Sequence, residues 1–349
     1  MPYKRGDSME SGYFGNNKMS LKNYINKQLF YLLKNRIEGY PQFRIAITYR
    51  CNNSCAYCAS AKVNGEADSD MKLGDFRKLL VWLKKQNIRK ILLTGGEPLI
   101  HKDISEVLDS CAELNFSTHI LTNGLLITPE LKKQIKNRAI WMVLNVNLDE
   151  SYHALKQNIP GIEEKIAMLR YNFRKRAEDY APLFKMAREY SVPIRFGFTV
   201  PSGHADNEYY TLKDMVTYKG QVMDFVKLSR LNLVRAHFSR PLPRCIFSEK
   251  EWAYLKKFSG VKSRCLIGAS GNYISRAIVN PDLSADVCYA SLSRAASILD
   301  FKELKDLNQY FKDKIDALRA KPLLDKCIHC RYYNDFSCQG GCLIYKNVS

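Results

Sequence analysis

The sequence has no long apolar run, no internal repeat and no low-complexity tract. None of its segments approaches the roughly 18 consecutive apolar residues that a membrane-spanning helix requires, so we expect no membrane span. Residues 1–20 carry charges, glycines and asparagines where a secretory signal has an apolar stretch, so we expect a cytoplasmic protein. The composition, 46% hydrophobic and 26% charged, predicts a folded globular chain and argues against disorder.

Acidic residues are scarce beside basic ones. The chain has 35 Asp and Glu against 54 Lys and Arg, which gives a formal net charge of +19. This excess favours an anionic partner, such as a nucleotide or a phosphorylated metabolite, although a solvated lysine-rich surface explains it equally well. The basic residues form no long block, so nucleic acid is an unlikely partner.

Cysteine is abundant in contrast. Eleven cysteines are many for a chain without an export signal, because disulfides do not persist in a reducing cytosol. Clustered cysteines in that setting indicate metal or redox chemistry. Cys111 lies among apolar residues of a predicted helix and is expected in the core. The other cysteines are candidate metal ligands.

Apolar periodicity predicts helices and strands that alternate up to about residue 238. Such units imply an α/β fold with a parallel sheet and helices packed outside it, because parallel strands need crossover connections. The functional site of such a fold lies at the carboxyl ends of the strands. The predicted strands are residues 43–48, 90–93, 117–121, 140–148, 193–200 and 231–238. The predicted helices are residues 21–37, 73–86, 104–114, 129–136, 162–173 (with a continuation toward Tyr190) and 210–228.

The composition changes after about Pro243. Strand–helix alternation gives way to scattered cysteines and one helical stretch near residues 301–320. We therefore predict three parts: an N-terminal arm and helix (1–40), an α/β domain (41–243) and a small cysteine-rich C-terminal domain (244–349).

Three cysteines, Cys51, Cys55 and Cys58, follow the first predicted strand with the spacing C-x3-C-x2-C. Three thiolates on a short loop can bind three irons of a 4Fe–4S cluster, which usually has four cysteine ligands, and leave one iron open to an external ligand. A zinc site would need a fourth local ligand, and the nearest histidine downstream is His101. The polar residues between these cysteines argue against buried structural thiols.

A second motif, T-G-G-E-P at residues 94–98, follows the second predicted strand. Together with the three-cysteine loop it closely resembles the radical S-adenosylmethionine (SAM) superfamily. The resemblance implies a partial (β/α)6 barrel whose three cysteines hold a SAM-binding 4Fe–4S cluster. It further implies that the amino group of SAM is held by Gly95, Gly96 and Glu97, and that Tyr57 lies beside the adenine.

Other segments resemble the same family less closely. L-T-N-G at residues 121–124 is similar to the family's third-strand end, and N-V-N-L-D at residues 145–149 is similar to a fourth-strand segment that touches the SAM ribose. Asn145 and Asn147 fit equally well as ordinary polar residues at a strand end. The resemblance implies further SAM contacts from Asn123, Asn145, Asn147 and Lys156.

The C-terminal cysteines resemble the SPASM extension of radical SAM proteins, or its shorter twitch relative, which bind auxiliary iron–sulfur clusters. The family pattern is C-x2-C-x5-C-x3-C with a further downstream cysteine, whereas here the middle gap is seven and no cysteine follows Cys342. The resemblance implies one auxiliary cluster on Cys265, Cys288 and Cys342, with Cys245 as a candidate fourth ligand. It implies a second on Cys327, Cys330 and Cys338, with an open iron or with His329 or Asp335. A structural zinc site on Cys327, Cys330, Cys338 and Cys342 is the alternative.

The resemblance implies an oxygen-sensitive enzyme that cleaves SAM to a 5′-deoxyadenosyl radical and abstracts hydrogen from a substrate C–H bond. A reducing partner such as flavodoxin or ferredoxin would supply the electron. The charge, and the 50 residues before Cys51, too few for the usual leader-peptide domain, favour a small anionic metabolite such as a nucleotide sugar. Oxidation, epimerisation or cross-linking of a peptide side chain is the alternative, and a non-catalytic metal-binding module is a third hypothesis.

Overall fold

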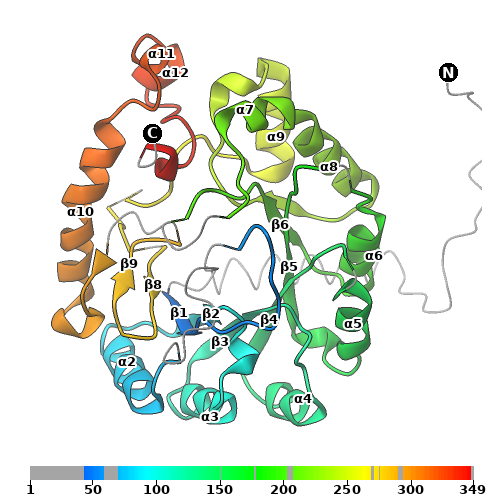
Figure 1. Ribbon diagram of the computed structural model, residues 1–349, viewed down its shortest axis with the longest axis vertical. Helices are drawn as coiled ribbons and strands as arrows, with labels where there is room; N and C mark the ends of the chain where they lie inside the picture. Colours follow the sequence, from blue (N-terminus) through cyan, green and yellow to red (C-terminus); the bar gives the residue numbers. More distant parts are fainter. Residues whose placement is uncertain are drawn as a thin grey trace, which may run out of the picture. The chain divides into compact units, whose positions relative to one another are not determined.

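The computed structural model describes residues 43–58, 70–149, 151–176, 178–202, 207–268, 271–274, 276–289 and 294–346. The predicted arm and helix within residues 1–40 lie outside these ranges. A curved parallel sheet forms the centre of the described chain (Figure 1).

Strands β1 to β7 pair in parallel and in chain order. All six residues of β1 are buried, as expected for a parallel strand covered on both faces. The α/β class and the parallel sheet predicted from the sequence are therefore confirmed. The strands are β1 (Phe43–Thr48), β2 (Lys90–Gly95), β3 (Ser117–Thr122), β4 (Ile140–Asn145), β5 (Ile166–Asn172), β6 (Ile194–Gly197) and β7 (Ala236–Phe238).

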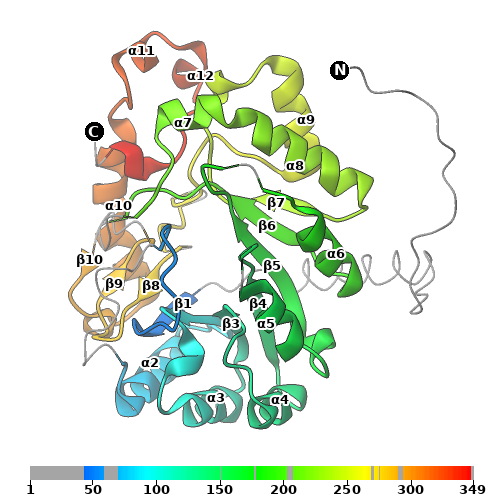
Figure 2. The same cartoon turned by 45° about the vertical axis from the view of Figure 1, so that its right-hand side comes forward.

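The crossover helices lie outside this sheet (Figures 1 and 2). Each turns an apolar stripe inward; α2, for example, buries Phe76, Leu79, Leu80 and Leu83. The hydroxyl of Thr128 caps α4 by accepting a hydrogen bond from the Leu131 amide at 3.2 Å. The helices are α2 (Leu73–Lys85), α3 (Ile104–Glu113), α4 (Pro129–Lys136), α5 (Ser151–Asn158), α6 (Ala181–Glu189), α7 (Leu212–Thr217) and α8 (Lys219–Leu231).

The helix predicted over residues 162–173 is wrong. Residues Ile166–Asn172 form β5, which pairs with β4 and β6. Leu169 and Tyr171 are buried, whereas Arg170 and Asn172 are half-buried, and this alternation is typical of a strand. Pairing on both sides outweighs a local preference for helix. The described barrel therefore has one parallel strand more than the six predicted.

Aromatic side chains fill the layer between β5, β6 and the outer helices. The ring of Phe225 on α8 lies 4.5 Å from that of Phe196, 4.9 Å from that of Phe184 and 5.3 Å from that of Phe173, measured between centroids. Successive strand residues point to opposite faces, so the neighbours of these aromatics on β5 and β6 face the inside of the barrel.

The cysteine-rich C-terminal region adds three short strands to the same sheet. β8 (Ile278–Val279) pairs in parallel with β1, and β9 (Ala285–Asp286) and β10 (Arg294–Ala295) continue antiparallel. The turn predicted at residues 280–282 connects β8 to β9, with the Leu283 amide donating to the Asn280 carbonyl at 2.9 Å. The helices here are α9 (Glu249–Ser259), α10 (Leu304–Ala320), α11 (Asp325–Ile328) and α12 (Arg331–Asn334). In both views α10 runs beside this hairpin (Figures 1 and 2).

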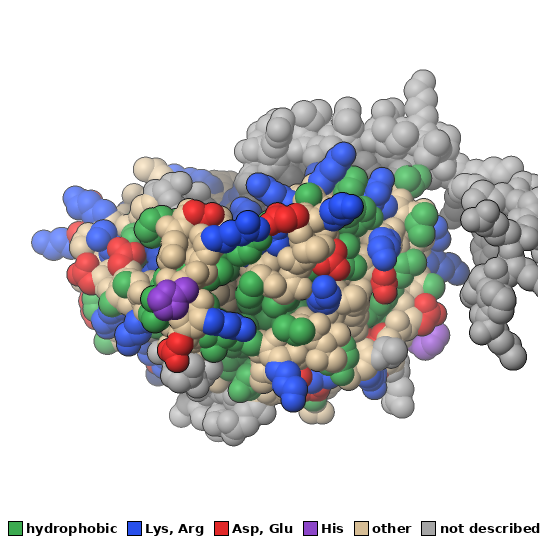
Figure 3. All heavy atoms as spheres, turned by 90° about the horizontal axis from the view of Figure 1, so that it is seen from above, with side chains coloured by type: hydrophobic (Ala, Val, Ile, Leu, Met, Phe, Trp, Pro, Cys, Tyr) green, Lys and Arg blue, Asp and Glu red, His purple; other side chains and the backbone are tan. Residues whose placement is uncertain are grey.

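Residues 41–349 group into one compact unit, so the domain boundary expected near residues 240–245 stays a prediction. Among the described helices, none combines the length and apolar character that crossing a bilayer demands. On the face shown in Figure 3, Lys and Arg side chains are spread among hydrophobic and acidic ones and do not gather in one block.

Candidate functional site

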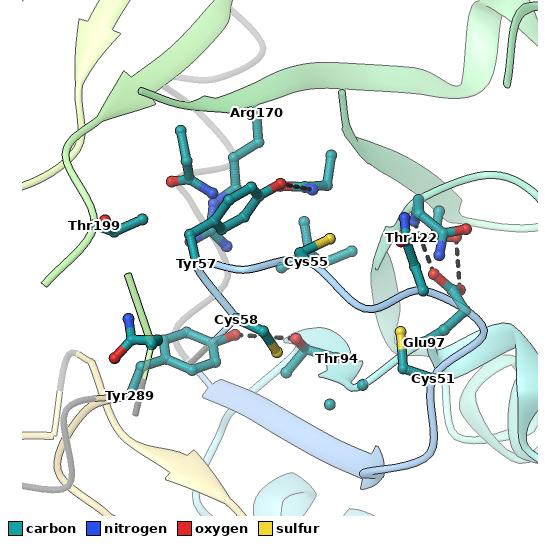
Figure 4. A pocket seen from close by; sticks show the side chains of 18 of the residues that line it. Cys51, Cys55, Tyr57, Cys58, Thr94, Glu97, Thr122, Arg170, Thr199 and Tyr289 are labelled. Atoms are coloured by element: carbon teal, nitrogen blue, oxygen red, sulfur yellow. Dashed lines mark hydrogen bonds between the residues drawn. The ribbon is translucent and has the colours of Figure 1, made fainter. Parts of the chain in front are cut away.

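The three cysteines of the first motif line one cavity at the carboxyl ends of the barrel strands (Figure 4). Their loop follows β1, and the Cys58 amide donates to the Cys55 carbonyl at 2.9 Å to close a tight turn. Burial raises the pKa of the Cys51 thiol to about 11 and also raises the pKa of Cys55. The free thiols of Cys51 and Cys55 would stay protonated at neutral pH, so a bound metal ion must favour the thiolate form that acts as a ligand.

Gly95 and Gly96 pack against the end of β1. A Cβ atom on Gly95, whose φ is +137°, would lie 1.8 Å from the carbonyl oxygen of Thr48, and one on Gly96 would lie 2.2 Å from that of Arg50. The Gly96 amide donates to the Thr48 carbonyl at 2.9 Å. Glycine is therefore required here because two backbones meet, which is a different reason from the ligand approach that the motif suggested.

Glu97 is almost fully buried, and its carboxylate accepts three hydrogen bonds. Oε1 accepts from Thr122 Oγ1 at 2.7 Å and from the Leu99 amide at 3.1 Å, and Oε2 accepts from the Asn123 amide at 2.8 Å. Burial raises the pKa of Glu97, although these hydrogen bonds oppose the shift. The side chain thus ties the ends of β2 and β3 together and still lines the cavity.

Tyr57 joins the cysteine loop to the end of β4. Its hydroxyl donates to Oδ1 of Asn147 and accepts from Nδ2 of Asn145 at 3.2 Å. Nδ2 of Asn147 also lies 3.6 Å from the sulfur of Cys55, as a donor to it. Burial raises the pKa of Tyr57, so its hydroxyl stays protonated. The structure therefore brings all three of these predicted residues together beside Cys55.

Asn123 and Lys156 differ in their placement. Asn123 lines the cavity, and its Nδ2 donates to Oδ1 of Asn52 at 2.8 Å, which connects the end of β3 to the cysteine loop. Lys156 does not line the cavity: its Nζ pairs with Glu189 at 3.0 Å and links α5 to α6. The structure does not bring Lys156 to the site.

Several basic and polar residues that line the cavity were missed from the sequence. Arg170 extends from β5 next to Tyr57 in Figure 4, and Thr199 follows β6. The misassigned helix hid Arg170, although the alternation over residues 169–172 was a strand signal that could have revealed it. Arg195 is the register partner of Arg170, so it lies on the same interior face. The missed lining residues are Asn53, Thr94, Leu121, Thr122, Arg170, Asn172, Thr199, Val200, Asn207, Arg240 and Tyr289.

The C-terminal cysteines occupy different surroundings from one another. Cys338 is buried, and its sulfur accepts from the amides of Arg244 at 3.5 Å and Gly340 at 3.3 Å. Burial raises the pKa of Cys265 to about 11, and the nearby Cys342 acts in the same direction. Each of the eleven cysteines lies in the described ranges and none forms a disulfide. Cys111 is buried in the core, as predicted.

Within the part of the chain that the structure describes, no group of three or more Cys, His, Asp or Glu side chains is placed to hold a metal ion. A cube of four irons keeps its thiolate ligands at separate corners, so it does not need the close convergence that a single tetrahedral ion requires. Three thiols around one cavity, with an amide donor directed at Cys55, suit a cluster of this kind.

A parallel barrel with a three-cysteine loop and a Gly-Gly-Glu turn at the same rim defines an enzyme that combines an iron–sulfur cluster with SAM. The profile of the radical SAM superfamily matches residues 45–216. Residues 45–216 therefore form a radical SAM domain, and a 4Fe–4S cluster and SAM are its cofactors.

Sequence relatives match about half of the chain. The GTP 3',8-cyclase of Helicobacter pylori is 27% identical over 220 residues, which are 55% of this chain and 67% of that protein. The probable GTP 3',8-cyclase of Thermococcus kodakarensis is 24% identical over 185 residues, 53% of this chain and 56% of that protein. The match thus leaves a third or more of each relative uncovered.

Two solved structures share the fold over most of the chain. SuiB of Streptococcus suis bound to its precursor peptide SuiA has a TM-score of 0.60 and 19% identity, covering 96% of this chain and 81% of that one. The protein anSMEcpe with bound SAM has a TM-score of 0.60 and 16% identity, covering 86% of this chain and 88% of that one. At these identities the likeness shows the fold alone.

Proposed function

We propose that this enzyme abstracts hydrogen from a small anionic substrate that binds in the same cavity as the cysteine loop. The observation that carries this proposal is the lining of the cavity, where Arg170 and Arg240 share one space with the three cysteines. Among the described residues that line it, Glu97 is the one acidic side chain, and three hydrogen bonds already hold its charge. A phosphate or carboxylate group would therefore meet a net attraction.

Cys51, Cys55 and Cys58 would hold the SAM-binding cluster. Bound there, the reduced cluster and SAM supply the 5′-deoxyadenosyl radical that removes a substrate hydrogen. The chain's own part is to position SAM and keep water away. Oε2 of Glu97 accepts a single bond, so it retains capacity for the ammonium group of SAM. Gly95 and Gly96 fix that carboxylate by packing its turn on β1.

Tyr57, Asn145 and Asn147 would contact the nucleoside part of SAM. The cavity holds about 150 Å³ in its present form, whereas small-molecule sites usually hold about 300 Å³ or more. Tyr57 and Asn145 line this cavity, and we expect the hydrogen bonds between Tyr57 and the two asparagines to exchange for bonds to the cofactor. Asn123 would remain a link between loops.

The C-terminal cysteines would bind auxiliary iron–sulfur clusters that exchange electrons with the substrate, and a flavodoxin or ferredoxin would reduce the enzyme. Peptide modification is the second candidate function. It is favoured by the fold shared with SuiB, whose structure contains a precursor peptide, and with anSMEcpe. The two GTP 3',8-cyclases among the sequence relatives, whose names refer to GTP, favour the anionic small molecule, whereas a relative named PqqA peptide cyclase favours the peptide.

Substrate pools distinguish the two candidates. The protein is reconstituted anaerobically with iron and sulfide, reduced with dithionite and supplied with SAM, and 5′-deoxyadenosine is quantified. Nucleotides and phosphorylated metabolites should increase its formation at least several-fold, whereas short peptides should not. Stimulation by peptides alone would overturn the small-molecule proposal, and an absence of SAM cleavage under any condition would contradict the placement of the cluster.

A further inference from the structure

A short segment before α9 packs directly on the C-terminal segment that carries Cys330 and Cys338. This segment contains the 3-10 turn η4 (Arg244–Ile246). The backbone amide of Arg244 donates to the sulfur of Cys338 at 3.5 Å. Cys245 directly follows Arg244 in the chain, so its backbone lies close to that sulfur. A second amide, from Gly340, donates to the same sulfur at 3.3 Å. Amide donors of this kind stabilise a thiolate that binds iron.

Side chains lock the two segments together. The Arg244 guanidinium is buried and lies 4.8 Å from the centroid of the Tyr332 ring. Glu249, at the start of α9, accepts a bond from Arg244 and one from Arg331 at 2.7 Å. A Cβ atom on Gly341 would lie 2.9 Å from Cδ of Pro243, so only glycine permits this approach. These contacts hold η4 against the segment that carries Cys330 and Cys338.

The remaining cysteines divide into two neighbourhoods. Cys245 has Cys338 and Cys330 as its thiol neighbours, and both act electrostatically on it. Cys327 adjoins Cys330 through a backbone hydrogen bond of 3.1 Å, and Lys346 lies close enough to interact with both Cys327 and Cys338. Cys265 instead has Cys342 as its neighbour.

The two weaker candidates for a fourth ligand, His329 and Asp335, are exposed, as Cys245 also is. Oδ1 of Asp335 accepts from the Ser337 amide at 2.8 Å and is exposed. His329 is exposed at the end of α11. A cubic cluster is normally held by four thiolates, and Cys245 is a further thiol that neighbours Cys330 and Cys338.

We infer that Cys245, together with Cys327, Cys330 and Cys338, binds one auxiliary 4Fe–4S cluster. This inference rests on the proposed function, which places auxiliary clusters in the C-terminal region. It differs from the sequence-based expectation, in which Cys245 was a candidate fourth ligand for the cluster on Cys265, Cys288 and Cys342. The family pattern takes its last ligand from a cysteine downstream of the C-x3-C pair. In this chain Cys245, which precedes all the other auxiliary cysteines, would take that place.

The test counts iron and sulfide in a chain that lacks the SAM-binding cluster. A variant with Cys51, Cys55 and Cys58 changed to alanine is reconstituted anaerobically as the full chain. Cys338→Ala in this background should lose about four irons per chain. Adding Cys245→Ala should lose no more, because both residues serve one cluster, whereas adding Cys265→Ala should lose about four more. An additive loss from Cys245→Ala would overturn the inference.

Electron paramagnetic resonance gives a second readout, which does not require the variant to lose its cluster. In the same background, Cys245→Ser should retain iron but shift the signal of one reduced cluster, while His329→Ala and Asp335→Ala leave both signals unchanged. An unchanged signal in Cys245→Ser would overturn the assignment of Cys245 as a ligand and leave the proposed function untouched. If the background variant itself bound no iron, the auxiliary clusters of the proposed function would fail instead.

Discussion

The hydroxyl of Thr122, the last residue of β3, donates a hydrogen bond of 2.7 Å to the carboxylate of Glu97, which follows β2. Both residues are almost fully buried. The same hydroxyl accepts from the Gly124 amide at 2.9 Å, so one threonine fixes the turns after two neighbouring strands. The geometry of the cavity rim therefore depends on a side chain that is not itself required to touch a ligand.

Replacing Thr122 should weaken the rim. In Thr122→Val the buried carboxylate loses one donor and the Gly124 amide loses its acceptor, so we expect the free energy of unfolding to fall by about 1–3 kcal/mol. Thr122→Ser is the matched control, because it keeps the hydroxyl and should recover most of the loss. Chemical denaturation of the cluster-free protein measures both, and equal stability of the valine and serine variants would contradict this role.

The Gly95 position should tolerate no side chain. In Gly95→Ala the new Cβ would lie 1.8 Å from the Thr48 carbonyl oxygen in a backbone conformation with φ of +137°. We expect a loss of about 3 kcal/mol or more, or failure to fold. Gly74, in the first turn of α2, has nothing within 4 Å of its Cβ position. Gly74→Ala should therefore be neutral or stabilise by up to about 1 kcal/mol.

The positions of strands β1 to β4 and the cysteine rim could be predicted because both depend on local pattern. The apolar runs of β1 to β4 and the motifs after them lie close in sequence to the elements that position them. β5 was missed since its pairing with β4 and β6 is a tertiary effect. Arg170 was lost with it. The neighbours of Cys245 were also beyond reach, because Cys338 lies 94 residues from Arg244 in the chain.

The ion pair of Arg50 and Asp70 should make stability depend on pH. Nε and Nη2 of Arg50 donate to the Asp70 carboxylate at 3.0 and 2.6 Å, and Thr48 Oγ1 donates at 2.5 Å. Burial alone would raise the pKa of Asp70, but these bonds lower it below its ordinary value. An acid with a depressed pKa in the folded state stabilises the fold at neutral pH and loses that contribution as the pH falls.

Asp70→Asn should therefore lower the free energy of unfolding at pH 7 by about 1–2 kcal/mol. The difference from the wild type should shrink as the pH falls below about 4, where the wild-type carboxylate of the unfolded chain becomes protonated. Asp75→Asn, which removes an exposed pair with Lys78 on α2, should cost less than about 0.5 kcal/mol. A difference that grew on acidification would contradict the sign of the shift.

Lys156 should be dispensable for SAM cleavage. It pairs with Glu189 on the outside of the barrel, and both side chains are partly exposed. Lys156→Ala should change the rate of 5′-deoxyadenosine formation by less than about twofold and the stability by less than about 1 kcal/mol. A loss of tenfold or more in SAM cleavage would restore the role that its sequence position suggested.

Arg170 should matter for the substrate more than for SAM. Its side chain lines the cavity next to Tyr57, on the inner face of β5. In Arg170→Ala, basal SAM cleavage without substrate should persist, whereas the stimulation by an anionic substrate should fall by about 10- to 100-fold, because a charged hydrogen bond of about 1.5–3 kcal/mol is lost. Arg176→Ala removes an exposed arginine that pairs with Glu178 and serves as the control. Equal stimulation of the Arg170 and Arg176 variants would show that the anionic group binds elsewhere. A loss of basal cleavage confined to Arg170→Ala would instead assign this arginine to SAM.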